Sequence, residues 1–328
     1  MLNTNPESKR LIPTSQNSIF GSSVAVCRML AEINGLSWQP VGPQKDLGVV
    51  YECFSRLHLR DYILSPRGYW GCNEADPELC SAYVELVAQL CRDWRCRCIT
   101  WHFRHDARGQ LELALARLGR SNCEVTQSYV HVISLCDESY EHFVSRRITK
   151  ITRQQIQQGL RSGVEFRNID SPEELDQFYI LHLAWANQKG VQPRPREFFQ
   201  RVVAELSQWS SMVGVFSSET LLAGLLIWRD RYVWHAGYIV RNYEKDKRHA
   251  NDVLFAGVLK DAINKGIRDF NLGGSAGIQS LEFFKKRWGA EKMPTWRLKW
   301  ENPFWKMVMR PVRMARPGAR SEKSHEVE

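Results

Sequence analysis

The order of helix and strand signals in the second half of the chain constrains its fold more than any other feature. A capping box formed by Ser171 and Glu174 starts an amphipathic helix, and a second one follows over 196–209. Runs rich in β-branched and aromatic residues and further apolar repeats then predict strands at 212–216, 221–228, 232–240, 267–272 and 295–300, with helices at 251–265 and 278–287. The resulting order, helix–helix–β–β–β–helix–β–helix–β, indicates a mixed α/β domain.

The first half of the chain carries weaker signals of the same class. Strands are predicted at 48–54, 98–103 and 129–134, around a helix that begins at Asp76 and Pro77. All nine cysteines lie between Cys27 and Cys136, and the remaining 192 residues have none. With 328 residues in total, this step in composition favours two α/β domains.

The charge of the chain predicts an anionic partner. Lys and Arg number 45 against 36 Asp and Glu, a net charge of +9, which suits nucleic acid, a phosphorylated carrier or an acidic membrane face. No run of about 18 apolar residues predicts a membrane span, and no apolar run near the N-terminus predicts a signal peptide. An odd number of cysteines without a CxxC pair is typical of reduced thiols. We therefore expect a cytoplasmic protein.

Two segments near the C-terminus form the most specific motif of the chain. They read GIRDFNLGGS over 266–275 and FFKKRWGAE over 283–291. Together they resemble the GNAT N-acyltransferases, in the branch of the Fem-type peptidoglycan-bridge aminoacyl transferases and the acetyltransferase-like proteins of exopolysaccharide gene clusters. The segments 145–166 and, more weakly, 65–71 are similar to the same branch.

The resemblance implies two tandem GNAT-like domains, each a mostly antiparallel mixed sheet flanked by helices. We expect the first at 1–163, including a basic linking helix from Glu141 to Leu160, and the second, with the active site, at 164–302. Residues 303–328 form a basic tail that is either amphipathic or frayed. It could contact an anionic membrane.

The same resemblance implies an amide-forming acyltransferase that moves an acyl or aminoacyl group from acyl-CoA or aminoacyl-tRNA to an amine by direct attack. The acceptor would be a small molecule, a peptide or a cell-wall precursor. The CoA-using members carry a glycine-rich pyrophosphate loop, whereas residues 241–251 here contain no glycine. Asn271 also stands where the family usually has Asp. These two departures weaken the case for acetyl-CoA as the donor, and both donors stay open.

Lys285 is the first candidate for catalysis, because it occupies the Phe-Lys position of the family motif; a solvated helix face is the alternative. We expect Lys285 to be exposed, so that Lys285→Ala costs within about 0.5 kcal/mol of stability. Ser275 could donate a hydrogen bond to the acyl oxygen or cap the next helix, and His235 could act as a base or merely be packed.

Several further residues are candidates for binding the substrate or the donor. They are glycines that allow close approach, an aromatic ring that could stack, and cations that could hold phosphates: Phe284, Gly273, Gly274, Arg241, Lys245, Lys247, Arg248, Arg146, Lys150 and Arg153. The last three would form one stripe of the linking helix.

We expect neither a metal nor a tightly bound cofactor. Cys96, Cys98, His102 and His105 offer four potential zinc ligands, but their spacing matches no common structural site. The competing function is a non-catalytic module that keeps the GNAT fold and docks a membrane-associated polysaccharide-synthesis complex.

Overall fold

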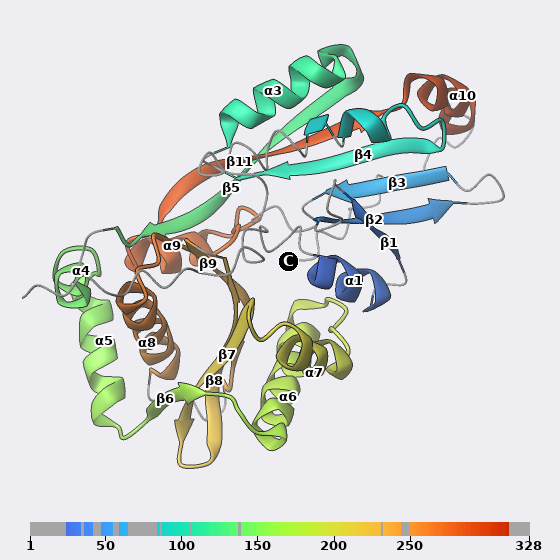
Figure 1. The fold of residues 1–328 in the computed structure, drawn as a ribbon. Coiled ribbons are helices and arrows are strands. Elements are labelled where there is room, and N and C mark those ends of the chain that lie inside the picture. The colour runs from blue at the N-terminus through green and yellow to red at the C-terminus, as the bar shows by residue number, and fades with distance from the viewer. Residues whose placement is uncertain are drawn as a thin grey trace, which may run out of the picture.

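The eleven strands that the structure describes join in one mixed sheet that is flanked by helices (Figure 1). The computed structural model describes residues 24–33, 36–41, 47–54, 59–64, 84–85, 87–104, 107–136, 139–230, 232–243 and 249–314. The order of the strands across the sheet is β1-β2-β3-β4-β11-β5-β10-β9-β8-β7-β6. The predicted mixed α/β class with flanking helices is confirmed.

The strands are β1 (Ser37–Val41), β2 (Leu47–Phe54), β3 (Leu59–Leu64), β4 (Cys96–Phe103), β5 (Cys123–Ser134), β6 (Glu165–Asn168), β7 (Ser210–Ser217), β8 (Thr220–Arg229), β9 (Val233–Arg241), β10 (Asp269–Asn271) and β11 (Glu291–Glu301). The helices are α1 (Val24–Ile33), α3 (Arg108–Leu118), the 3₁₀ turn η3 (Arg120–Asn122), α4 (Tyr140–Arg146), α5 (Lys150–Arg161), α6 (Pro172–Lys189), α7 (Arg196–Glu205), α8 (Ala250–Asn264), α9 (Gln279–Arg287) and α10 (Pro303–Met314).

The two halves of the chain exchange strands at the centre of the sheet. The C-terminal strand β11 lies between β4 and β5, antiparallel to both, so Leu298 pairs with Trp101 on one side and with Val125 on the other. The strand β5 in turn pairs with β10 of the second half. The strands of the two halves therefore continue into one another, and the boundary at residue 163 remains a prediction.

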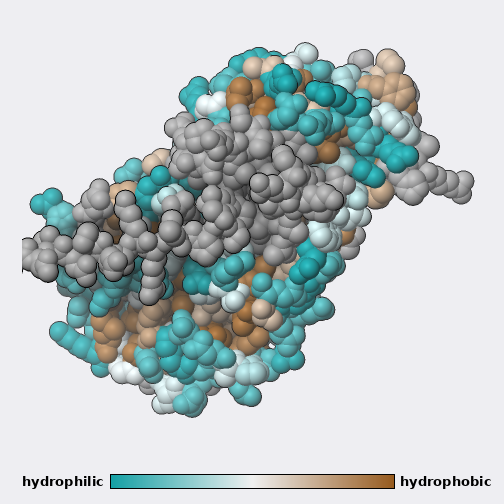
Figure 2. All heavy atoms as spheres, viewed as in Figure 1, coloured by the Kyte–Doolittle hydropathy of each residue, from teal (hydrophilic) through white to brown (hydrophobic). Residues whose placement is uncertain are grey.

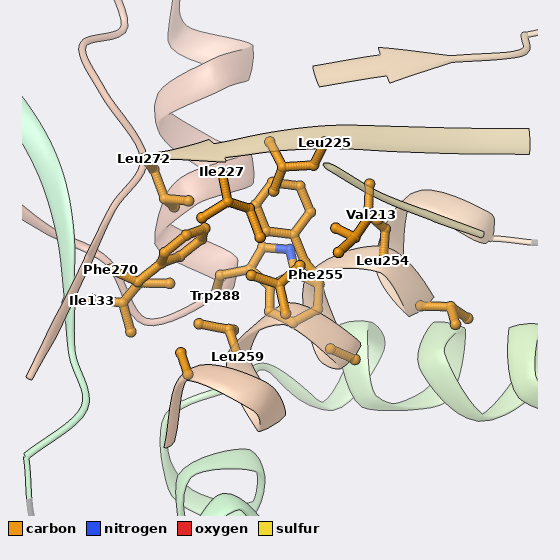
Figure 3. Packing of buried hydrophobic residues seen from close by; sticks show 14 of the residues in the cluster. Ile133, Val213, Leu225, Ile227, Leu254, Phe255, Leu259, Phe270, Leu272 and Trp288 are labelled. Carbon is orange, nitrogen blue, oxygen red and sulfur yellow. The ribbon is translucent and has the colours of Figure 1, made fainter. Parts of the chain in front are cut away.

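Alternation along β7 to β9 divides the second half into two cores. Val213 of β7 faces α8, while its neighbour Met212 faces α6 and α7. Figure 3 shows the α8 side, where Trp288 lies among Leu225 of β8 and Leu254 of α8. A third core under β4 and β11, around Trp101, is covered by α3. Apolar cores therefore pack on both faces of the sheet in the second half of the chain, which carries the C-terminal motif.

The prediction of one continuous linking helix from Glu141 to Leu160 is wrong, because two helices, α4 and α5, cover this range. The helix is interrupted between α4 and α5, where the side chain of Ile148 is buried in the core. Thr149 caps α5, because its hydroxyl accepts a hydrogen bond from the amide of Thr152 at 3.4 Å. Since Arg146 belongs to α4, it does not continue the stripe of Lys150 and Arg153.

The first twelve residues of the predicted tail form the helix α10, and residues 315–328 lie outside the described residues. Within the part of the chain that the structure describes, no helix is both long and apolar enough to cross a membrane.

Candidate active site

The strands β9 and β10 pair only briefly and then separate. Their last parallel pair is His235 with Asn271, after which β9 continues to Arg241 while β10 ends. The β8–β9 register shifts just beyond this point, between Leu225 and Ile227. Gly237 permits this bulge, since a Cβ there would lie 2.7 Å from the Leu226 carbonyl oxygen. Because β10 ends at Asn271, the part of β9 that follows His235 is not paired with β10.

Buried polar side chains gather at the end of β10. The described residues hold eleven buried polar or charged side chains, and four of them lie at the end of β10 or contact the turn that follows it. They are His131, Asn271, Ser275 and Lys285. Burying polar groups costs free energy unless they are hydrogen-bonded, so a concentration of them is a marker of a functional site.

The turn after β10 is fixed by side chains on both of its sides. The Asn271 Oδ1 accepts a hydrogen bond from the Gly273 amide at 2.8 Å, and Gly273 adopts a positive φ of 74° that suits glycine. The Lys285 ammonium donates to the carbonyl oxygens of Gly273 and Gly274 at 2.9 and 2.5 Å. Asn271 thus supplies the hydrogen bond that an Asp would make here.

The expectation of an exposed Lys285 is wrong. Its side chain comes from α9 and is 7% exposed, whereas Lys286 beside it is exposed. The two positions differ because successive helical residues point about 100° apart. Lys285 holds the Gly-Gly turn and therefore acts as a positioning residue.

Ser275 and His131 form a hydrogen-bonded pair beside this turn. The Ser275 Oγ lies 3.3 Å from the His131 Nδ1, and both side chains are 4% exposed. Burial, followed by the positive charge of Lys285, lowers the pKa of His131 below its ordinary 6.5. His131 is therefore neutral at pH 7 and can accept a proton.

The predicted capping role of Ser275 is wrong. The N-cap of α9 is Ile278, and its side chain makes no capping hydrogen bond. The Ser275 carbonyl accepts a backbone hydrogen bond from the Ile278 amide at 2.7 Å, and the Ser275 hydroxyl lies against His131.

His235 belongs to the opposite face of the sheet. Its neighbours Trp234 and Phe270 join the core under α8, so His235 and Asn271 point the other way. The structure thus brings Ser275, Lys285, Gly273 and Gly274 together and separates His235 from them.

Most of the predicted donor-binding residues lie elsewhere or have other partners. Phe284 packs edge-on against Phe255 of the core, with ring centroids 5.3 Å apart, and the Arg241 guanidinium stacks over Tyr243. Lys245, Lys247 and Arg248 lie outside the described residues.

The outer face of α5 forms a polar groove of about 790 Å³. It is lined by Lys150, Arg153, Gln154, Gln157, Gln158 and Arg161. Arg153 also donates to the carbonyls of Val144, Ser145 and Ile148, so it caps the end of α4. The described residues that line the groove include cations and amides but no acid. The opposite side of α5 joins the site helix α9, since Arg287 donates to the Thr152 hydroxyl at 3.0 Å.

His131 is the functional candidate that sequence reasoning missed. It lies within the predicted strand 129–134, as a lone polar side chain among the buried residues Val130, Val132 and Ile133. A single polar residue inside an apolar strand was the sequence signal that could have indicated a functional role for His131. Its partner is 144 residues away, a pairing that no local motif contains. Among the described residues, no group of three or more His, Cys, Asp or Glu side chains is placed to hold a metal ion.

Comparison with known proteins identifies a family that matches the segment carrying most of this site. The family described as "Acetyltransferase (GNAT) domain" matches residues 145–309, which is half of the chain and includes α9 and most of the site. A curated relative, the UDP-N-acetylmuramoylpentapeptide-lysine N(6)-alanyltransferase of Weissella viridescens, is 30% identical over 86 residues. The matched segment spans about a quarter of that relative's length.

Solved structures share the fold at low sequence identity. FemX superimposes with a TM-score of 0.66 at 10% identity, covering 86% of this chain and 93% of its own. The L-PGS of Bacillus licheniformis gives a TM-score of 0.57 at 12% identity, covering 87% and 91%. The matched family covers half of the chain, so the chain belongs to the GNAT acetyltransferase-domain family, and it shares the fold of FemX.

Proposed function

We propose that the protein forms an amide by moving an aminoacyl group from aminoacyl-tRNA to an amine, with the reaction centre at the end of β10. The observation that carries this proposal is the buried pair of His131 and Ser275 beside the point where β9 and β10 separate. An acyl transfer between two bound substrates needs a positioned amine, an acceptor for its proton and donors for the oxyanion.

The proposed reaction is a direct attack. The amine nitrogen forms a bond to the acyl carbonyl carbon, and the oxyanion is stabilised by backbone N–H groups at the edge of β9. The amine loses a proton through the Ser275 hydroxyl to the neutral His131, and the C–O bond to the tRNA ribose breaks. His131 then returns the proton to the leaving ribose oxygen, which becomes a hydroxyl, so the reaction balances.

The choice of tRNA over CoA rests on two features. The loop 241–251 has no glycine to bring its backbone close to a pyrophosphate. The groove on α5, with its cations and three glutamines, suits an extended phosphate backbone better than a short pantetheine arm. A donor of this kind places the enzyme in the cytoplasm, with a peptide, small molecule or cell-wall precursor as the acceptor.

Hydroxylamine provides a test that does not require the natural acceptor. A mixed pool of aminoacyl-tRNA and, separately, acetyl-CoA are incubated with enzyme and hydroxylamine, and the hydroxamate formed above the enzyme-free rate is measured. We expect hydroxamate from the tRNA pool. Product from acetyl-CoA alone would show that the donor is a CoA thioester.

Ser275→Ala tests the proton path in the same assay. We expect turnover to fall roughly a hundredfold. The double variant with His131→Gln should lose no more than the worse single variant, because residues that act as a unit are not additive. Independent losses that multiply would contradict a shared relay.

A further inference from the structure

The helix α10 presents apolar side chains to solvent although it is held firmly against the fold. Phe304 is 56% exposed and Met307 is 67% exposed, and Val308 is exposed beside them. Figure 2 shows apolar spheres at the tip of the molecule that α10 occupies in Figure 1. Large apolar side chains clustered on a surface mark a place of interaction more often than a chance exposure.

Specific contacts anchor this helix to the start of β4 and to the turn before it. The Asn302 Nδ2 donates to the Cys96 carbonyl at 3.0 Å, and its Oδ1 accepts from the Phe304 amide at 3.0 Å. Trp305 is buried and donates its indole N–H to the Trp94 carbonyl at 2.6 Å. The outward orientation of Phe304 and Met307 is thus a fixed feature of the fold.

A second aromatic side chain extends the patch from outside the helix. Trp94 is 56% exposed, and its ring centroid lies 6.4 Å from that of Trp305. The Arg95 guanidinium stacks over the Trp94 ring at 5.5 Å. Tryptophan and arginine together are typical of the boundary between lipid headgroups and acyl chains.

The charge of the helix selects the partner. Residues 303–314 contain three basic residues and no acidic one, and Lys306 is exposed, as Phe304 and Met307 are. A helix that combines exposed Phe and Met with cations alone fits an anionic bilayer surface, where the apolar side chains insert and the cations meet headgroup phosphates.

We propose that Trp94 and α10 form an interfacial anchor that binds the protein peripherally to an anionic lipid bilayer. The anchor lies far from the reaction centre. Lys292 pairs with His131 at one end of β11, and Pro303 follows eleven residues later, a span of about 36 Å along an extended strand. The anchor can therefore hold a membrane while the end of β10 stays open.

Vesicle co-sedimentation of the full chain tests the proposal. The probes are vesicles of phosphatidylglycerol mixed with phosphatidylcholine and vesicles of phosphatidylcholine alone. We expect binding to the anionic vesicles that weakens with salt. The double variant Phe304→Ser/Met307→Ser should bind at least about tenfold more weakly, because two exposed apolar side chains no longer insert.

Two further variants complete the experiment. Lys306→Gln should weaken binding about fivefold, as expected for one cation near an anionic surface. The control Leu113→Ser/Ile180→Ser removes equally exposed apolar side chains from α3 and α6 and should bind as the wild type does. All of these positions are exposed, so thermal melts should agree closely.

Three outcomes would overturn the proposal. They are failure of the wild type to bind anionic vesicles, equal binding by the Phe304→Ser/Met307→Ser variant, and a lipid-free dimer that this variant converts to a monomer. The last result would assign the patch to self-association. Hydroxamate formation from the tRNA pool is measured separately, so failure of the anchor is distinguishable from failure of the acyl transfer.

Discussion

The buried position of Lys285 changes what its substitution should do. Its ammonium fixes the Gly273 and Gly274 carbonyls from a site that is 7% exposed, so Lys285→Ala should lower the free energy of unfolding by about 1.5–3 kcal/mol. Lys286→Ala, at an exposed position, should change it by less than about 0.5 kcal/mol. Chemical denaturation measures both. Equal, small effects would contradict the role of Lys285 in holding the turn.

The pKa of His131 predicts the pH dependence of turnover. Because its pKa lies below 6.5, the neutral base persists at pH 7, and kcat/KM should fall only as the pH drops through the lowered value. Lys285→Met removes a positive charge that lowers this pKa, so the acid limb should move to higher pH. A pH–rate profile unchanged by Lys285→Met would show that the limb belongs to another group.

At the scale of single residues, the sequence predicted part of the site. Lys285, Ser275 and the Gly-Gly turn were found because they lie in two neighbouring segments, 266–275 and 283–291, that resemble a family motif. The capping role of Ser275 and the exposure of Lys285 were predicted wrongly, since the surroundings of both side chains depend on packing from distant segments. Contacts between residues 144 positions apart leave no periodic signal.

At the scale of elements, the bulge in β9 depends on Gly237. A Cβ there would meet the Leu226 carbonyl oxygen at 2.7 Å and the Trp228 Nε1 at 2.8 Å, closer than real contacts allow. Gly237→Ala should therefore cost about 1–3 kcal/mol of stability and lower turnover measured on folded protein. Unchanged melting together with unchanged turnover would show that the bulge does not need a glycine.

The interface of α6 and α7 with the sheet should be sensitive to acid. His182 is buried there, its Nε2 accepts from the Arg194 amide at 3.0 Å, and burial, then the charge of Arg194, lowers its pKa to about 4. The unfolded chain binds a proton at about 6.5, so stability is full above that pH and is lost as the pH falls toward 4. Denaturation at about pH 7 and about pH 4.5 should show a smaller loss for His182→Phe. An equal loss would contradict this contribution.

The elements of the second half were largely predictable, and in the first half the predicted strands at 48–54, 98–103 and 129–134 correspond to β2, β4 and β5. The strands β7, β8 and β9 and the helix α8 follow predicted ranges, because each has strong periodicity and turn residues at its ends. The short strands β1, β3 and β6 were missed, since four to six residues carry little periodic signal. The break before Thr149 was missed because the burial of Ile148 is a tertiary effect.

At the scale of the whole molecule, the exchange of β5 and β11 should couple the two halves. The core under β4 contains Leu298 and Trp300 of β11, and β10 pairs with β5. Fragments 1–163 and 164–328 should therefore be insoluble or unfolded when expressed alone and should fold together when co-expressed. Circular dichroism and co-purification measure this. Cooperative unfolding of either fragment by itself would show that the halves are independent domains.

The central claim, that the pair of His131 and Ser275 is the reaction centre, is tested most directly by hydroxamate formation from aminoacyl-tRNA with His131→Gln. The account predicts a rate roughly a hundredfold below wild type, with an unchanged rate for His142→Gln, a histidine exposed on α4. A folded His131→Gln protein that transfers the aminoacyl group as fast as the wild type would contradict it.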